Sequence, residues 1–167
     1  VRDTEAFDDA EMRELFRIVI RKAPPLHRAV ILLLFTTGMR NHEVRKVKLK
    51  NFENREGIKV LRYIGKGQKL NTVPIHPVAA HHLGQYMDWM ESKGRPIGPE
   101  DFFFQPSKVS EGESRGGRQL SHTALGYIVK KWAKRVNITK RITPHSARAT
   151  FISSLLENGE DIYAVAQ

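Results

Sequence analysis

The sequence predicts a mainly α-helical domain with a small antiparallel β-sheet, which is an α+β fold. Helical periodicity with capping signals recurs along most of the chain, and two β-branched runs flank a short glycine-containing turn. The 167 residues, 40% of them hydrophobic, suffice for one hydrophobic core and are too few for two ordinary domains. We therefore expect residues 1–167 to form a single domain.

The first two helices are predicted by their start signals. Asp8 and Glu11 have the spacing of a capping box, in which each side chain binds the backbone N–H of the other residue. The apolar face of this helix follows at helical spacing: Leu15, Ile18 and Val19. Pro24 and Pro25 then suit a turn into the next helix, since proline has no N–H and a fixed φ. The run from Leu26 to Phe35 is apolar on all sides, which predicts the central helix of the core.

A short helix and a hairpin are expected next. Gly38 suits the end of the central helix, and Asn41 is the expected N-cap of the short helix. β-branched residues in near alternation predict strands over 58–64 and 72–75. The intervening Gly65-Lys66-Gly67-Gln68 predicts a hairpin turn with Lys66 at or near its tip.

The remaining segments alternate helix and loop. Helical periodicity predicts a helix from Pro77 to Ser92, and three glycines predict a long loop over residues 105–119. Ser121 is the expected N-cap of an amphipathic helix, and Thr143-Pro144 starts another that runs to Gly159. The helix after Ser121 has an apolar and a basic face, with Leu125, Ile128, Val129 and Trp132 inside and Lys130, Lys131, Lys134 and Arg135 outside.

The composition indicates a polyanionic partner. Twenty-eight Lys and Arg residues against 18 Asp and Glu give a net charge of +10, which is typical of nucleic-acid binding but shared by ribosomal proteins and binders of anionic membranes. The absence of cysteine excludes a disulfide scaffold, a thiolate zinc site and a cysteine nucleophile. No apolar run approaches the ~20 residues of a membrane span, and no secretory leader is visible. We expect a soluble protein of a reducing compartment.

Three segments present a cationic side chain in an unusual setting. Arg40 directly follows the buried helix, with Glu43 one helical turn on, and Lys66 stands between two glycines. His145 and Arg148 share one face of a helix start. Taken singly, each has a common structural explanation: a surface ion pair, a solvated turn lysine, or a hydrogen-bonding residue near a helix end.

Together these side chains suit a phosphate substrate. Two guanidinium groups can bind non-bridging phosphate oxygens in bidentate fashion. The histidine adds a donor or a proton acceptor, and the lysine can protonate a leaving oxygen. This combination predicts phosphoryl transfer without a metal ion.

The order of these segments resembles the catalytic domain of the tyrosine recombinases, the phage-integrase family. The matching elements are Thr-Gly-Met-Arg-x-x-Glu at residues 37–43, the Gly-Lys-Gly hairpin followed by Val73-Pro74-Ile75, and Pro-His-x-x-Arg-x-Thr-Phe at residues 144–151. The resemblance extends from about Asp8 to Gln167. It implies the fold of the DNA breaking-rejoining enzymes.

The resemblance also implies roles for these residues. Arg40 and Arg148 match the family's phosphate-clamping arginines, His145 its histidine, and Lys66 its general acid, while Glu43 matches a position that supports the first arginine. A tyrosine would attack the phosphate to form a 3′-phosphotyrosine, without metal or other cofactor. The implied partners are double-stranded DNA and further protomers, in a tetramer on DNA. The implied location is cytoplasmic and nucleoid-associated.

The sequence departs from the family pattern in two places. Ala147 precedes Arg148 and Ala149 follows it where many members have leucine and histidine, which we interpret as variation rather than loss of the motif. The family's next motif and its nucleophilic tyrosine are not found before Gln167, and the tyrosines present have patterns typical of packing residues: Tyr63, Tyr86, Tyr127 and Tyr163. We therefore expect a catalytic domain without its amino-terminal core-binding domain and its nucleophile segment, which binds DNA but cannot cleave it alone.

Other basic residues are expected to contact the DNA backbone without reading sequence: Lys69, Arg115, Arg118, Lys130, Lys134 and Arg141. His76, His81 and His82 have no nearby carboxylate at ligand spacing, so we predict no metal site. Two alternatives stay open. The chain could be a catalytically inactive DNA-binding module of the same fold, or a basic RNA-binding protein whose motif matches are coincidental.

Overall fold

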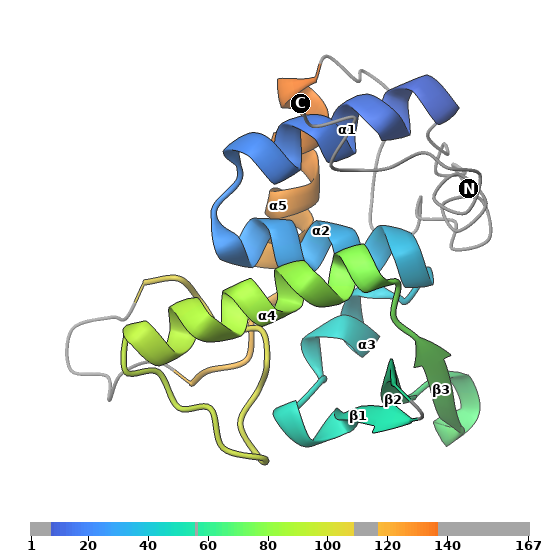
Figure 1. The fold of residues 1–167 in the computed structure, drawn as a ribbon, viewed down its shortest axis with the longest axis vertical. Coiled ribbons are helices and arrows are strands. Elements are labelled where there is room, and N and C mark those ends of the chain that lie inside the picture. Colours follow the sequence, from blue (N-terminus) through green and yellow to red (C-terminus); the bar gives the residue numbers. More distant parts are fainter. Residues whose placement is uncertain (1–7, 56, 109–116, 137–167) are drawn as a thin grey trace.

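The computed structural model describes residues 8–55, 57–108 and 117–136 (Figure 1). The elements are α1 (Asp9–Lys22), α2 (Pro25–Thr37), α3 (Asn41–Arg45), η1 (Leu49–Asn51), β1 (Phe52–Arg55), β2 (Ile58–Ile64), η2 (Lys66–Gln68), β3 (Leu70–Pro74), α4 (Pro77–Ser92) and α5 (His122–Arg135). The strands form one antiparallel sheet in the order β1-β2-β3. The predicted fold class, mainly helical with a small antiparallel sheet, is confirmed.

Helix α2 is the centre of the core. Its residues from Ala29 to Phe35 are all 0% exposed, as the uniformly apolar sequence predicts. Helices α1, α4 and α5 pack against it, and Figure 1 shows α4 lying along α2 on the side that faces the sheet. The predicted start signals of α1 and α2 are present, with the Asp8–Glu11 capping box on α1 and Pro25 in the first turn of α2.

The sheet contains one strand that the sequence did not predict. β1 pairs with β2 from Phe52 opposite Leu61 to Arg55 opposite Ile58. Its sequence, Phe-Glu-Asn-Arg, contains a single apolar residue, so the two-residue periodicity of a half-buried strand is missing. Strand β2 has the predicted bounds, whereas β3 begins at Leu70, before the predicted start at Thr72.

Helix α4 has the predicted bounds, and the chain that follows it returns to the sheet. Phe103 and Phe104 are buried in this returning segment, which forms an isolated bridge between Lys48 and Phe102. The described parts of the predicted loop over 105–119 contain no helix or strand. Gln105 in that loop is nevertheless buried, and its side-chain Nε2 donates to the carbonyls of Pro96 and Phe102, both at 2.8 Å.

Helix α5 is joined to α2 by a partly buried side-chain hydrogen bond. The indole Nε1 of Trp132 donates to Nδ1 of His27 over 2.9 Å, which requires an unprotonated Nδ1. Burial, with a smaller contribution from the charge of Lys131, lowers the pKa of His27 to about 4. The neutral ring of His27 is therefore part of the contact that positions α5.

This contact predicts a stability that falls in mild acid. The pKa of unfolded histidine is about 6.5, so the unfolded chain takes up a proton near that pH whereas folded His27 does so only near pH 4. The resulting stabilisation is complete above about pH 6.5 and is lost as the pH falls towards 4. Urea unfolding at pH 7.5 and pH 5.0 measures the difference.

The variant that tests this prediction is His27→Gln. It should reduce the pH dependence of stability, and the remainder should come partly from His82, whose pKa burial also lowers to about 4. Equal pH dependence in the wild type and His27→Gln would contradict the role given to His27.

In the described part of the chain, no helix has the length and apolar character needed to cross a bilayer.

Candidate functional site

Arg40 lies at the junction between the buried helix α2 and the short helix α3. Gly38 ends α2 in a left-handed conformation, with φ of 72°, which glycine adopts without strain. The following Met39 is 2% exposed and anchors the turn in the core. Arg40, rather than the predicted Asn41, is the N-cap of α3, and its side chain is exposed. The core thus fixes the backbone from which the guanidinium extends.

Glu43 fixes this turn from within. Its side chain is 8% exposed, and its Oε1 accepts a hydrogen bond from the main-chain N–H of Arg40 at 2.8 Å. The two residues therefore do not form the surface ion pair that their spacing also allows; the carboxylate holds the backbone at the start of α3. The sequence identified the pair, but the burial of Glu43 is visible only in the structure.

Lys66 lies in the exposed turn between β2 and β3. The main-chain N–H of Gly65 donates to the carbonyl of Lys69 over 2.8 Å, which closes the turn. Gly67 and Gln68 both have positive φ, 72° and 62°, so the backbone turns sharply just after Lys66. The predicted hairpin, with Lys66 near its tip, is confirmed.

The Arg40 turn and the Lys66 hairpin meet at Glu43. A Cβ atom placed on Gly65 would lie 3.2 Å from Oε2 of Glu43 and 2.1 Å from Nδ2 of Asn71, so only glycine fits without displacement. Burial and the charge of Glu43 raise the pKa of Tyr63, which precedes this point in β2. One oxygen of the Glu43 carboxylate therefore accepts from the Arg40 backbone, and the other lies beside Gly65, the residue before Lys66.

A second set of contacts ties α3 to the start of α5. Asn41 Nδ2 donates to the carbonyl of His122 at 3.3 Å, and Asn41 Oδ1 accepts from Nε of Arg45 at 2.5 Å. Gln119 donates to the carbonyl of Arg45 at 3.1 Å. These positioning roles were not predicted from the sequence, because hydrogen bonds between residues far apart in the chain leave no periodic signal.

The basic face of α5 is oriented as predicted. Ser121 caps the helix by accepting from the N–H of Ala124 at 3.0 Å. Its predicted inner residues are buried, and its outer residues are exposed: Lys130, Lys131, Lys134 and Arg135. Lys69 and Arg118 are also exposed. The other predicted site residues lie outside the described residues: His145, Arg148, Arg115 and Arg141.

The described tyrosines differ in their environments. Tyr86 is 0% exposed, as predicted for a packing residue, and burial raises its pKa to about 12. The same prediction is wrong for Tyr127, which is 60% exposed on α5 because it lies on the outer face of the helix. His76 caps α4 by accepting from the N–H of Val78 at 3.1 Å. His81 and His82 both contact Gln85. Within the described residues, no group of three or more His, Cys, Asp or Glu is placed to hold a metal ion.

Glu43→Ala is expected to loosen both the start of α3 and the hairpin. The loss of a capping hydrogen bond costs about 0.5–2 kcal/mol of unfolding free energy. Because Oε2 of Glu43 also lies beside Gly65, we expect faster amide hydrogen exchange at Gly65 as well as at Arg40. Exchange measured by NMR and urea unfolding test the two effects.

Glu11→Ala is the matched control for Glu43→Ala. Glu11 accepts the same kind of bond in α1, from the main-chain N–H of Asp8 at 2.9 Å, but α1 lies far from the hairpin of β2 and β3 (Figure 1). Glu11→Ala should lower the free energy of unfolding by a comparable amount without changing amide hydrogen exchange at Gly65. If both variants changed hairpin exchange equally, Glu43 would have no specific connection to the hairpin.

Residues 5–167 match the model of the phage integrase family, which covers nearly the whole chain. The chain therefore belongs to the phage integrase family. It is 33% identical over 141 residues to the tyrosine recombinase XerD of Halalkalibacterium halodurans, which covers 84% of this chain and 44% of that relative. The tyrosine recombinase XerC of Haemophilus influenzae is 26% identical over 140 residues, covering 84% of this chain and 43% of the relative.

Solved structures show the same fold. The XerA recombinase matches over the full chain with a TM-score of 0.69 and 23% identity, covering 56% of that structure. The XerH site-specific recombinase, bound to palindromic difH substrate in a post-cleavage complex, matches over 98% of this chain and 45% of its own, with a TM-score of 0.69 and 21% identity. The chain spans less than half the length of the two curated relatives named above.

Proposed function

We propose that this chain is the catalytic domain of a site-specific DNA recombinase or integrase. The observation that carries the proposal is that a buried carboxylate, Glu43, joins the Arg40 turn to the Lys66 hairpin in a chain of the phage integrase family. Both cations are exposed on backbone that the fold holds in place. Preorganised charges of this kind stabilise a reaction in which negative charge develops on a phosphate.

The proposed reaction is metal-independent cleavage and rejoining of DNA through a 3′-phosphotyrosine. A tyrosine oxygen attacks the phosphorus, and the bond to the 5′ oxygen breaks. Arg40 and Arg148 would bind the non-bridging oxygens, Lys66 would give its proton to the departing 5′ oxygen, and His145 would add a donor or proton acceptor. The covalent intermediate keeps the phosphodiester energy, so a 5′-hydroxyl can rejoin the strand without ATP.

We also propose that the attacking tyrosine lies outside these 167 residues. Tyr86 is enclosed in the core, and the environment of Tyr63 favours its protonated form. The chain matches only 44% of the length of the XerD relative, which leaves room for further segments in such proteins. The 167 residues alone would then bind duplex DNA without cutting it, and the complete protein would act as a tetramer on DNA.

The basic residues outside the phosphate site would hold the flanking DNA backbone. In the described residues these are exposed side chains: Lys69, Arg118, Lys130 and Lys134. Arg115 and Arg141 are proposed for the same role. Contacts of this kind position a protein on the duplex but do not specify sequence. A protein with this role would act on the nucleoid.

Measuring binding to duplex DNA and to RNA distinguishes the proposed function from the alternative that this chain is a basic RNA-binding protein. Fluorescence anisotropy of the 167-residue chain should show tighter binding to duplex DNA than to RNA hairpins of equal length, with an affinity that falls steeply with salt. A preference for RNA would overturn the proposal.

A further inference from the structure

An apolar groove lies on the opposite end of β2 from Lys66. It has a volume of about 300 Å³ and is bounded by the sheet, by α4 and by the segment that returns after α4. Figure 1 shows this segment coming back beside β1. Lys59 lines the groove near the start of β2, and at about 3.3 Å per residue roughly 16 Å of strand separates it from Ile64, just before Lys66. The groove is therefore separate from the proposed phosphate site.

The floor of the groove is a packed aromatic pair. The rings of Phe52 and Phe103 lie 4.7 Å apart, and Phe103 is 3% exposed. Leu83 from α4 is equally buried, whereas Met87 at the rim is 39% exposed. A firm floor with an exposed, adaptable methionine at the rim is typical of surfaces that accept a hydrophobic side chain.

Gly84 opens the groove at the middle of α4. Glycine inside a helix is unfavourable relative to alanine, because it loses more backbone entropy on folding. The usual reasons for keeping it are absent at this position: Gly84 does not have a positive φ, and a Cβ placed on it would meet no atom within 4 Å. The missing side chain leaves space that the packing of α4 does not require.

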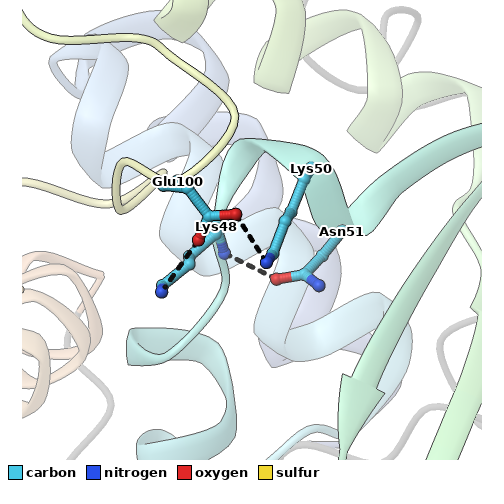
Figure 2. A network of polar contacts seen from close by, with 4 residues as sticks. All are labelled: Lys48, Lys50, Asn51 and Glu100. Carbon is cyan, nitrogen blue, oxygen red and sulfur yellow. Dashed lines mark hydrogen bonds and ion pairs between the residues drawn. The ribbon is translucent and has the colours of Figure 1, made fainter.

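The charges at the groove favour an acidic ligand. In the described part of the chain, Lys50 and Lys59 line it and no carboxylate does. Lys50 pairs with Glu100 at 2.7 Å, and Lys48 reaches the same carboxylate at 3.4 Å (Figure 2). Because Glu100 has two lysine partners, Lys50 can turn to a ligand carboxylate while Lys48 still neutralises Glu100.

We propose that this groove binds a short segment of an acidic partner protein, which inserts one or two bulky apolar side chains and places a carboxylate near Lys50 and Lys59. A second copy of this chain is a poorer occupant, because two chains of net charge +10 repel each other. Duplex DNA is also poorer, since it offers no apolar side chain to an aromatic floor. The groove and the phosphate site can be occupied together.

The test uses a fluorescein-labelled peptide, Glu-Asp-Leu-Phe-Glu-Asp, and measures anisotropy and ¹H–¹³C shifts of the Met87 methyl group. Gly84→Leu should fill the groove and weaken binding at least about tenfold, equivalent to ~1.4 kcal/mol. Lys59→Glu should also weaken binding, whereas Glu100→Gln should strengthen it by releasing Lys50. Replacing Leu-Phe in the peptide by Ser-Ser should abolish binding.

Gly126→Ala is the matched control for the groove. Gly126 lies inside α5, where a Cβ placed on it would likewise meet no atom within 4 Å, and it does not line the groove. Gly126→Ala should raise thermal stability, because alanine is more favourable than glycine inside a helix, and should leave peptide affinity unchanged. Circular dichroism of Gly84→Leu, with a melting temperature at or above that of the wild type, separates groove filling from misfolding.

Three results would overturn the proposal. The first is that the wild-type chain does not bind the acidic apolar peptide, and the second is that Gly84→Leu binds it as tightly as the wild type does. The third is a concentration-dependent dimer, seen by sedimentation, that Gly84→Leu abolishes, since this would assign the groove to a second copy.

Discussion

Arg40→Ala in the complete protein is expected to reduce the yield of covalent protein–DNA adduct by about 10²–10³-fold while changing duplex affinity less than about tenfold. The reason is where the charge develops. In the attack of tyrosine on a phosphate, negative charge grows on the non-bridging oxygens in the transition state, so an arginine aimed there stabilises the transition state more than bound DNA. Adduct yield on denaturing gels and anisotropy with duplex DNA measure the two quantities.

The structure explains why this effect should be specific to Arg40. The Arg40 backbone is fixed on one side by buried Met39 and on the other by the carboxylate of Glu43, so the side chain starts from a preorganised position. Arg55 is the matched control, an exposed arginine on β1 at the far end of the sheet from Lys66. Arg55→Ala should leave adduct yield near that of the wild type. Equal losses in the two variants would reduce Arg40 to a general contributor of positive charge.

Lys66→Ala is expected to slow cleavage of normal DNA by about 10²–10⁴-fold, the usual range for the loss of a general acid. The departing 5′ oxygen is a poor leaving group unless it is protonated as the bond breaks. A substrate with sulfur in place of that oxygen leaves as a thiolate and needs no proton. Lys66→Ala should therefore cleave the sulfur substrate within about tenfold of the wild-type rate.

Lys69 is the matched control for Lys66, because it is an exposed lysine at the same turn. Lys69→Ala should weaken DNA binding uniformly across sequences and lower the salt dependence by about one phosphate contact. It should show no preference for the sulfur substrate. If Lys66→Ala slowed the oxygen and sulfur substrates equally, Lys66 would contribute binding and not a proton.

Most of the fold could be predicted because its elements have local signals. The Asp8–Glu11 capping box, the prolines before α2 and the Ser121 cap are each present in the structure. β1 could not be predicted, since pairing with β2 and the contact of Phe52 with Phe103 stabilise it rather than its own periodicity. The N-cap of α3 is Arg40 and not Asn41: Glu43 accepts from the main-chain N–H of Arg40, and the Asn41 side chain contacts His122 and Arg45 instead.

The candidate site was predictable as a set of residue types and not as an arrangement. Arg40 and Lys66 stand out by their neighbours in the sequence, yet nothing local shows that Glu43 lies beside Gly65. That contact depends on the packing of α3 against the hairpin. The groove beside Gly84 had no signal in the sequence, because a single helical glycine is read as a weak point of the helix until its surroundings are known.

We propose that this family member acts on DNA through a covalent phosphotyrosine that forms without metal. The most direct measurement uses a nicked DNA duplex that carries the site the protein binds. This duplex is incubated, with EDTA present, with a protein extended past Gln167 to include a downstream tyrosine. The nick lets the cleaved fragment diffuse away, so the intermediate accumulates. We expect a covalent protein–DNA complex that disappears when the downstream tyrosine is replaced by phenylalanine and falls sharply with Arg40→Ala. A protein that binds the site but forms no adduct, or an adduct that survives loss of every downstream tyrosine, would rule out a covalent intermediate on a downstream tyrosine.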